Sequence, residues 1–258
     1  MRRAVGLGVI NVFVAGALGA LATGAVWAAD APAASAVAGG GYAALAKLPD
    51  WSGVWDLDYR GGGGLTRPAP PHLTAEYAKK YAEYQARQKK GEEQQTETAN
   101  CVPPGMPMIM AQPYPVEFLF TPGKITVAIE AYSQMRRIFT DGRKHPADPD
   151  PSYQGNSIGH WEGDTLVVDT VGFVDTTLLA PGVAHTEDMH MVERIHMASP
   201  ERMVIESTVT DPKVLMEPWT FTKAYQRHKD WDIKEYICDQ NNRDSADDKG
   251  KAGLRIER

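Results

Sequence analysis

Four charged residues stand on strand-like stretches that are otherwise apolar: Arg137, Asp169, Glu193 and Glu235. Arg137 shares one strand face with Met135 and Phe139, and Glu193 is the single charge on an apolar face of its own strand. An unpaired carboxylate in such surroundings has a raised pKa and can exchange a proton near neutral pH. An arginine can hold the anion that forms. These residues predict proton-transfer chemistry on a small molecule.

Three histidines accompany these charges at predicted strand ends or in loops: His145, His160 and His185. Imidazole titrates near neutral pH, which suits general acid–base work. We expect Glu193 and His185 to act as the acid–base pair. Arg137 would hold the anion, and His160 with Asp169 would form a second pair. The alternative is that Glu193 and Arg137 form a buried salt bridge across strands.

The expected reaction is an elimination, isomerisation or water addition, of the lyase or isomerase class, without an organic cofactor. Six tryptophans and ten tyrosines favour a ring-bearing, aromatic or phenolic substrate. The predicted substrate contacts are Trp161, Tyr77, Met106, Met108, Trp219 and Glu130. The tyrosine stripe that includes Tyr77 either covers a ligand or docks its helix, and the methionines either line a pocket or fill the core.

Two other functions remain open. A metal-dependent hydrolase would use His185, Glu187 and His190, joined by His145 or His160, although their spacing fits no familiar metal signature. A non-catalytic periplasmic carrier would hold an apolar or aromatic ligand in a pocket without convergent titratable groups. We assign no metal ligands. The net charge of −6 argues against a nucleic-acid partner, because such binding relies on Lys and Arg.

The stretch Ile158–Phe173 is expected to fold as a β-hairpin with a Gly-Asp pair at its turn. Apolar residues alternate along its second arm, so one face is apolar and the other carries Asp169. The hairpin would hold His160, Trp161 and Asp169 on a stiff scaffold. The alternative is a plain hairpin whose Asp169 lies in solvent.

One helix, Thr74–Lys90, is predicted from its capping residues and its tyrosine stripe. The other expected strands are Leu48–Tyr59, Val116–Phe120, Ile125–Glu130, Gln134–Thr140, Glu187–Met197, Arg202–Thr210, Pro218–Arg227 and Trp231–Cys238. Strands joined in series by short turns predict a mainly-β fold, either an antiparallel barrel or a strongly bent sheet of about eight to nine strands. A barrel of this size holds one small ligand.

The N-terminus begins with two arginines, continues with an apolar stretch and ends with small residues, which predicts a Sec-type signal peptide over residues 1–29. A retained membrane anchor is the alternative. We expect a flexible tether at 30–46, one barrel domain at 47–244 and a disordered tail at 245–258. The protein would then be periplasmic or secreted, without stable membrane insertion after cleavage. The sequence does not indicate its oligomeric state.

The two cysteines, Cys101 and Cys238, are expected to form a disulfide, as is usual in exported proteins. Closing so long a loop restricts the unfolded chain by roughly 5 kcal/mol on the chain-entropy model.

Five strings carry a family resemblance: DGRKHP at Asp141–Pro146, GHWEGDTLVVDTVGF at Gly159–Phe173, HTEDMHMVER at His185–Arg194, TDPKVLMEPW at Thr210–Trp219 and EYICDQNNRD at Glu235–Asp244. Together they resemble a large, mostly uncharacterised family of exported bacterial lipocalin-like β-barrel proteins. The resemblance covers most of Trp51–Asp244. It implies a lipocalin-like barrel and an exported location, and it brings no established reaction.

Overall fold

The computed structural model describes residues 41–59, 69–91, 101–238, 244–246 and 252–254. The chain divides into a unit of Met1–Ala33 and a unit of Ala34–Arg258, and all described residues belong to the second unit. The predicted signal peptide therefore lies outside the described residues. Among the residues that are described, no helix has the length and apolar character needed to cross a membrane.

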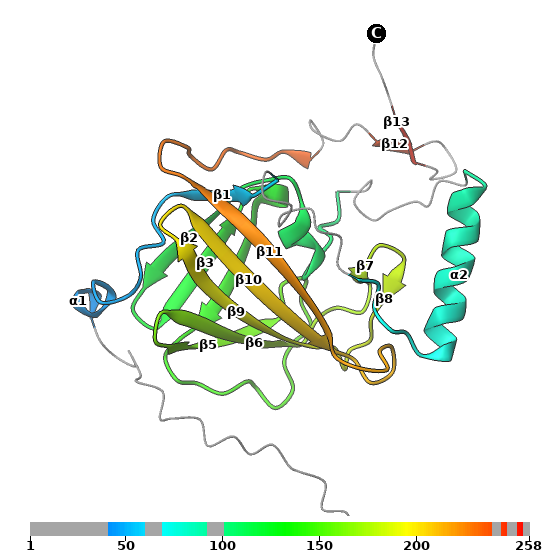
Figure 1. Ribbon diagram of the computed structural model, residues 1–258, viewed down its shortest axis with the longest axis horizontal. Coiled ribbons are helices and arrows are strands. Elements are labelled where there is room, and N and C mark those ends of the chain that lie inside the picture. Colours follow the sequence, from blue (N-terminus) through cyan, green and yellow to red (C-terminus); the bar gives the residue numbers. More distant parts are fainter. Residues whose placement is uncertain (1–40, 60–68, 92–100, 239–243, 247–251, 255–258) are drawn as a thin grey trace, which may run out of the picture. The chain divides into compact units, whose positions relative to one another are not determined.

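Nine strands form a closed barrel: β1 Val54–Leu57, β2 Val116–Thr121, β3 Lys124–Ile129, β4 Gln134–Phe139, β5 Asn156–Glu162, β6 Thr165–Val171, β9 His190–Ser199, β10 Arg202–Thr210 and β11 Trp219–His228. Their order around the barrel is β1, β11, β10, β9, β6, β5, β4, β3, β2 (Figure 1). Neighbours are antiparallel except β4 and β5, which pair in parallel over two positions. The predicted mainly-β barrel is confirmed.

The remaining described elements are short, apart from one helix: α1 Tyr42–Leu45, α2 Ala75–Lys89, η2 Met108–Ala111, η3 Ala131–Ser133, β7 Leu178–Ala180, β8 Val183–Ala184, β12 Asp244–Ala246 and β13 Ala252–Leu254. β7 pairs with β8, and β12 pairs with β13 in a region that overlaps the predicted disordered tail at 245–258. Their short ladders lie apart from the barrel sheet.

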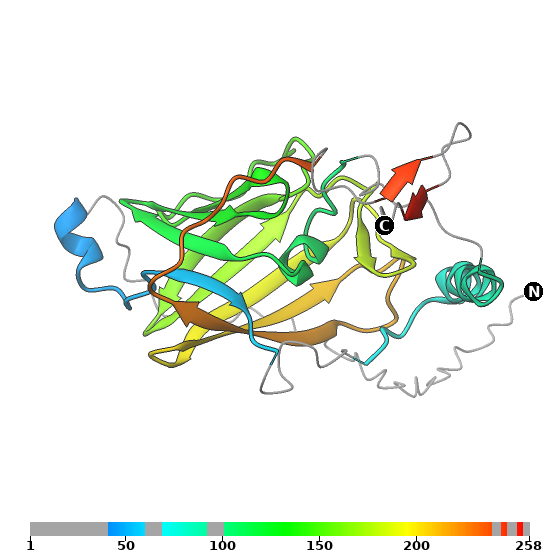
Figure 2. The same ribbon diagram turned by 90° about the horizontal axis from the view of Figure 1, so that it is seen from above.

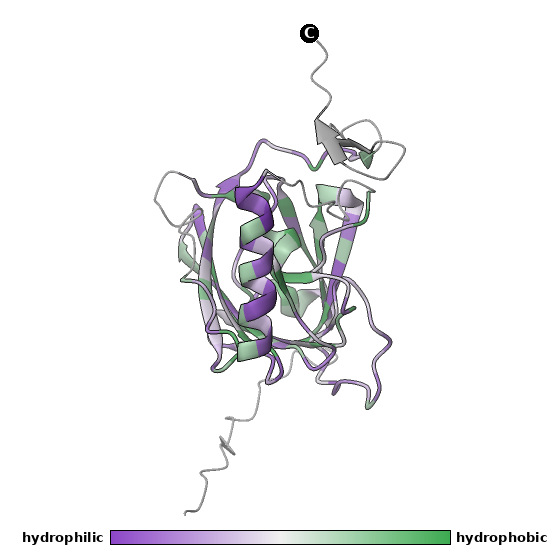
Figure 3. Ribbon diagram, turned by 90° about the vertical axis from the view of Figure 1, so that its right-hand side faces the viewer, coloured by the Kyte–Doolittle hydropathy of each residue, from purple (hydrophilic) through white to green (hydrophobic). Residues whose placement is uncertain are grey.

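Helix α2 matches the predicted helix to within one residue at each end. Figure 3 shows that it is mostly hydrophilic. Tyr77 and Tyr81 are partly buried against the core, and Gly182 of the β7–β8 turn lies so close to Tyr84 that a side chain at this glycine would overlap the ring. The tyrosine stripe therefore docks the helix.

Both ends of the barrel interior are filled by the chain itself. At the end where β2 turns into β3, the buried Trp51 ring lies 5.3 Å from Phe118 and 5.2 Å from Trp161. From the other side, the segment that contains Met106 and η2 enters the core, where the Tyr225 hydroxyl donates to the Met110 carbonyl at 2.6 Å. Met106 therefore fills the core, as methionines commonly do.

The predicted strand Trp231–Cys238 is wrong, because this segment is irregular and runs along the outside of the barrel (Figure 2). The Lys234 amide donates to Glu130 Oε2 at 2.8 Å, and the Tyr236 ring lies 5.1 Å from both Tyr114 and Tyr132. Packing on one side of an extended segment produces the same two-residue period as a strand, so the sequence pattern could not separate the two.

The predicted disulfide between Cys101 and Cys238 is confirmed, with a Cα–Cα separation of 5.6 Å across 137 residues of sequence. It joins the segment that enters the core to the end of the outer segment. The described cysteines include no free thiol.

Candidate functional site

A polar cluster lies inside the barrel. It comprises Arg136 on β4, Ser157 on β5, Thr170 on β6 and Glu193 on β9, each at most 1 % exposed. Arg136 forms a salt bridge with Glu193, and its guanidinium also donates to Thr170 Oγ1 at 3.0 Å and to Ser157 Oγ at 3.2 Å. The two hydroxyl oxygens are 3.0 Å apart. The charge of Glu193 is therefore balanced by a buried partner.

The predicted role of Arg137 is wrong, because this residue lies on the outer face of β4 and is exposed. Its expected apolar neighbour Met135 is also outside, with 51 % of its surface exposed. Adjacent residues of a strand point to opposite faces, so one of the two neighbouring arginines must face inward whichever set of alternate residues lines the interior. The fully buried Ile138 fixes the phase, and Glu193 supplies the counter-charge for Arg136. The alternative of a buried salt bridge was correct in kind, with the wrong arginine.

The expected pair of Glu193 and His185 does not form. His185 is buried in the segment before β9, where its Nε2 lies 2.7 Å from Thr177 Oγ1 and its Nδ1 lies 2.8 Å from the Thr186 carbonyl. Both ring nitrogens are thus engaged with partners other than Glu193. This histidine fixes a loop.

A second cluster lies on the outer face of β5, β6 and β9, and it is centred on Asp169. Asp169 Oδ1 lies 2.8 Å from His145 Nε2, and Oδ2 lies 2.9 Å from His190 Nε2. The other ring nitrogen of His145 lies 2.8 Å from Asn156 Oδ1. The hairpin expected here is confirmed, but its carboxylate holds two imidazoles from other elements.

The expected partnership of His160 with Asp169 is wrong. His160 is paired in register with Val167, which lies two residues before Asp169 on β6. The Nε2 atom of His160 lies 3.3 Å from Glu162 Oε1. Sequence reasoning missed His190 as the partner of Asp169. The available signal was the β9 alternation, which places His190 and Arg194 on the face opposite Glu193.

Electrostatics favour the charged forms of Asp169 and His190. Burial raises the pKa of Asp169, but the hydrogen bonds from His190 and His145 outweigh burial and leave the pKa below its usual value. The hydrogen bond to Asp169 raises the pKa of His190 against the opposing effect of burial. The His190 side chain is 40 % exposed, so this ion pair lies within reach of solvent.

The inner face of β11 carries a third group, formed by Trp219, Phe221 and Lys223. Their register partners Val209, Ser207 and Ile205 are all buried in the barrel, which places the three side chains on the inner side of the wall. The Trp219 and Phe221 rings are 4.5 Å apart, and Lys223 Nζ lies 4.2 Å from the Phe221 ring centre.

Sequence reasoning missed Lys223, although Phe221 and Tyr225 flank it at the two-residue spacing of a shared strand face. Its side chain is partly buried. Removal from water lowers the pKa of Lys223 to about 8, and the negative charge of Glu193 acts in the opposite direction.

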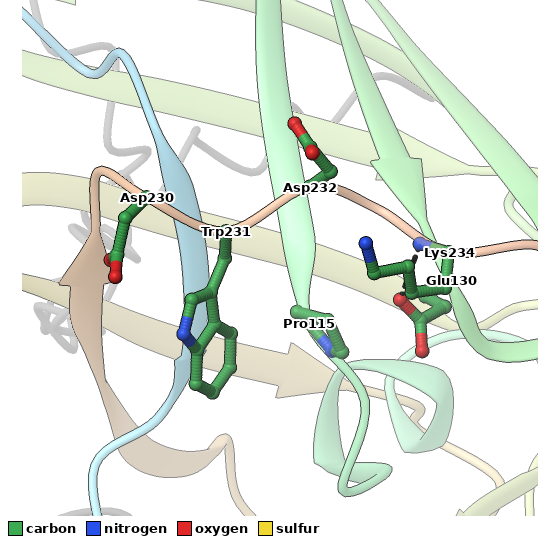
Figure 4. A pocket seen from close by; sticks show the side chains of 6 residues that line it. All are labelled: Pro115, Glu130, Asp230, Trp231, Asp232 and Lys234. Atoms are coloured by element: carbon green, nitrogen blue, oxygen red, sulfur yellow. Dashed lines mark hydrogen bonds between the residues drawn. The ribbon is translucent and has the colours of Figure 1, made fainter.

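The other predicted substrate contacts do not gather in one place. Trp161 belongs to the aromatic group around Trp51, and Met108 is partly buried beside the core. Glu130 lies at an outer hollow of about 320 Å³, lined by Pro115, Glu130, Asp230, Trp231, Asp232 and Lys234. Figure 4 shows Glu130 beside Lys234, with the Trp231 ring at the other end of the hollow.

The histidines of the metal hypothesis do not form one group, because His145 and His190 bond to Asp169 while His185 bonds to Thr177. Within the described ranges, no group of three or more His, Cys, Asp or Glu side chains is arranged to hold a metal ion.

No family model and no curated protein matches this chain. Among solved structures, the chain matches the crystal structure of a mutant of the fluorescent protein UnaG, with a TM-score of 0.31 and 14% sequence identity. That match covers 69% of this chain and 96% of the other. This similarity is too low to support an assignment of fold or function, so the barrel assignment rests on the strand pairing described above.

We predict that Arg136→Met lowers the free energy of unfolding by about 3–5 kcal/mol, because Glu193 is then buried without its partner. The double variant Arg136→Met/Glu193→Leu should lose less than the single variant. The measurement is urea unfolding followed by circular dichroism. Arg137→Met on the outer face is the matched control and should change stability by no more than about 0.5 kcal/mol. Equal losses at the two arginines would contradict the assignment.

We predict that the Asp169–His190 pair stabilises the fold most between about pH 4 and pH 6.5. Below this window Asp169 becomes protonated as the pH falls through its lowered pKa, and above it His190 loses its proton as the pH rises through its raised pKa. Urea unfolding should therefore show a larger loss for Asp169→Asn at pH 5.5 than at pH 9. Asp164→Asn in the exposed turn is the control, and a pH-independent loss for Asp169→Asn would refute the pairing.

Proposed function

We propose that this protein binds a small apolar or aromatic molecule at the inner face of β11 and acts as an exported carrier. The observation that supports this function most directly is the Trp219–Phe221 ring pair. It faces inward on the part of β11 that lies beyond the register with β1.

Among the described residues, β1 pairs with only one end of β11, because the two strands have unequal lengths. β1 has 4 residues and β11 has 10, and their register ends at Leu57 and Tyr225, with one more hydrogen bond from the Asp58 amide to the Ala224 carbonyl. On its other side, β11 pairs with β10 as far as Trp219. Among the described strands, none pairs with residues Trp219–Lys223 on the β1 side.

The chemistry of this face suits a ring-bearing ligand. Trp219 is only partly buried, and its indole N–H is already satisfied by the Ala69 carbonyl at 2.8 Å. Its ring and that of Phe221 thus offer apolar contact without an unmet polar group. Aromatic pairs contribute beyond the area that they bury.

Acid–base catalysis inside the barrel has less support than binding, because the charges expected to converge there do not. Arg137 and Asp169 lie outside the barrel, and Glu193 is neutralised by Arg136.

Two features support the exported location. The N-terminal pattern of residues 1–29 is typical of a signal peptide. The disulfide between Cys101 and Cys238 suits an oxidising compartment such as the periplasm.

We predict that the purified protein binds the neutral probe 3-(2-naphthyl)prop-2-enol, as measured by titration calorimetry and tryptophan quenching. Trp219→Leu and Phe221→Ala should each weaken binding by about tenfold through lost ring contact. Trp231→Leu, in the outer hollow, is the control and should leave the affinity unchanged. Absence of binding to the wild type, or equal effects of all three substitutions, would reject this site.

A second candidate is proton-transfer catalysis on the outer face, which the arrangement of His145 and His190 around Asp169 favours. A carboxylate that orients an imidazole is a recurrent element of acid–base sites. The test is incubation with phenolic, terpenoid and sugar-derived compounds followed by mass spectrometry. Turnover should be lost in both Asp169→Asn and His190→Gln and kept in His160→Gln. Turnover that survives Asp169→Asn would exclude this cluster.

A further inference from the structure

We propose that Lys223 binds the carboxylate of the ligand, so that the preferred ligand is a small aromatic acid. This inference rests on the proposed binding at the inner face of β11 and assigns the chemical class of the molecule held there. It follows from the charges inside the barrel and from the position of the ammonium at the Phe221 ring, which itself contacts Trp219.

The interior of the barrel carries one positive charge more than its described partners balance. Arg136 is paired with Glu193. Arg227 lies 3.3 Å from Asp50 Oδ2 and also donates to the Asp50 carbonyl. Lys223 has no hydrogen bond or ion pair with any described residue, and its contact is with the Phe221 ring.

An ammonium without a counter-ion is costly where water is scarce. A ligand anion would supply the missing charge and convert this cost into a charge-assisted hydrogen bond. Glu193 is paired with the Arg136 guanidinium through Oε2 and forms no ion pair with Lys223.

The position of Lys223 also sets the shape of the ligand. Trp219, Phe221 and Lys223 follow one another at two-residue steps on one face of β11, and each step is about 7 Å. A ring against Trp219 and Phe221 therefore places a carboxylate near Lys223 when a short linker separates the two, as in an arylpropenoic acid. A neutral alcohol of the same shape would make the ring contact but not the charged contact.

The ionisable groups of this part of the interior are Glu193, Arg136 and Tyr225, and Tyr59, 42 % exposed, acts on Tyr225 from the chain after β1. Burial raises the pKa of both tyrosines, so they stay neutral in the range of interest. Lys223, with its pKa lowered to about 8, remains mostly charged at pH 7 and loses its proton above pH 8. Affinity for the acid should therefore fall as the pH rises through about 8, while affinity for the neutral alcohol should not change.

The test compares 3-(2-naphthyl)propenoic acid with 3-(2-naphthyl)prop-2-enol by titration calorimetry at pH 7 and pH 9.5. The wild type should bind the acid more tightly at pH 7. Lys223→Met should lower the affinity for the acid by at least about tenfold and change the affinity for the alcohol by less than about twofold. Lys223→Arg should retain acid binding. Lys229→Met is the matched control, because this exposed lysine pairs with Glu201 at 3.2 Å on the outside, and it should bind as the wild type does.

The outcomes separate the two proposals. If acid and alcohol bind the wild type equally, or if Lys223→Met binds the acid as well as the wild type does, the role of Lys223 is overturned and the binding site stands. If neither compound binds, the proposed binding function itself is overturned. Urea unfolding checks that Lys223→Met is folded, and Lys223→Gln replaces it in the same comparison if it is not.

Discussion

The salt bridge between Arg136 and Glu193 is the constraint on which the interior depends. It joins β4 to β9 across the barrel, and the hydroxyls of Ser157 and Thr170 fill the space between these strands. It also spans one of the two shortest ladders of the barrel, since β4 and β5 pair over only two positions, as β1 and β2 do. The side-chain bond from Arg136 to Ser157 reinforces this junction where backbone hydrogen bonds are few. A buried pair need not add net stability, but breaking it is costly.

The same pair determines what the rest of the interior can do. Because Glu193 is paired with Arg136, the described residues of the interior include no free carboxylate. Lys223 therefore remains a cation next to the Phe221 ring. Strand alternation keeps the second polar cluster separate. Thr170 and Glu193 face inward, whereas Asp169 and His190 face outward on the same two strands. Two unrelated electrostatic sites therefore share one wall.

The sequence predicted most of the barrel because its strands alternate cleanly and its turns contain Gly and Pro where turns need them. Arg202–Thr210 was predicted to the residue, and the Ile158–Phe173 hairpin was placed correctly. The site was harder, since period alone does not fix the phase of a strand with two adjacent arginines. The partners of Asp169 come from a loop and from another strand, and only the fold brings them together. The inward position of Lys223 could have been predicted from its neighbours Phe221 and Tyr225, but this lysine belongs to no recognised motif.

The disulfide divides the barrel into covalently enclosed and unenclosed parts. The chain from Cys101 to Cys238 contains every barrel strand except β1, which lies before Cys101 in the sequence. β1 is anchored by four register positions on β11 and two on β2, and by the fully buried Trp55. The strand that closes the barrel, β1, therefore lies outside the loop that the disulfide closes. Detaching β1 would open the barrel between β11 and β2 while leaving the other eight strands paired as one continuous sheet.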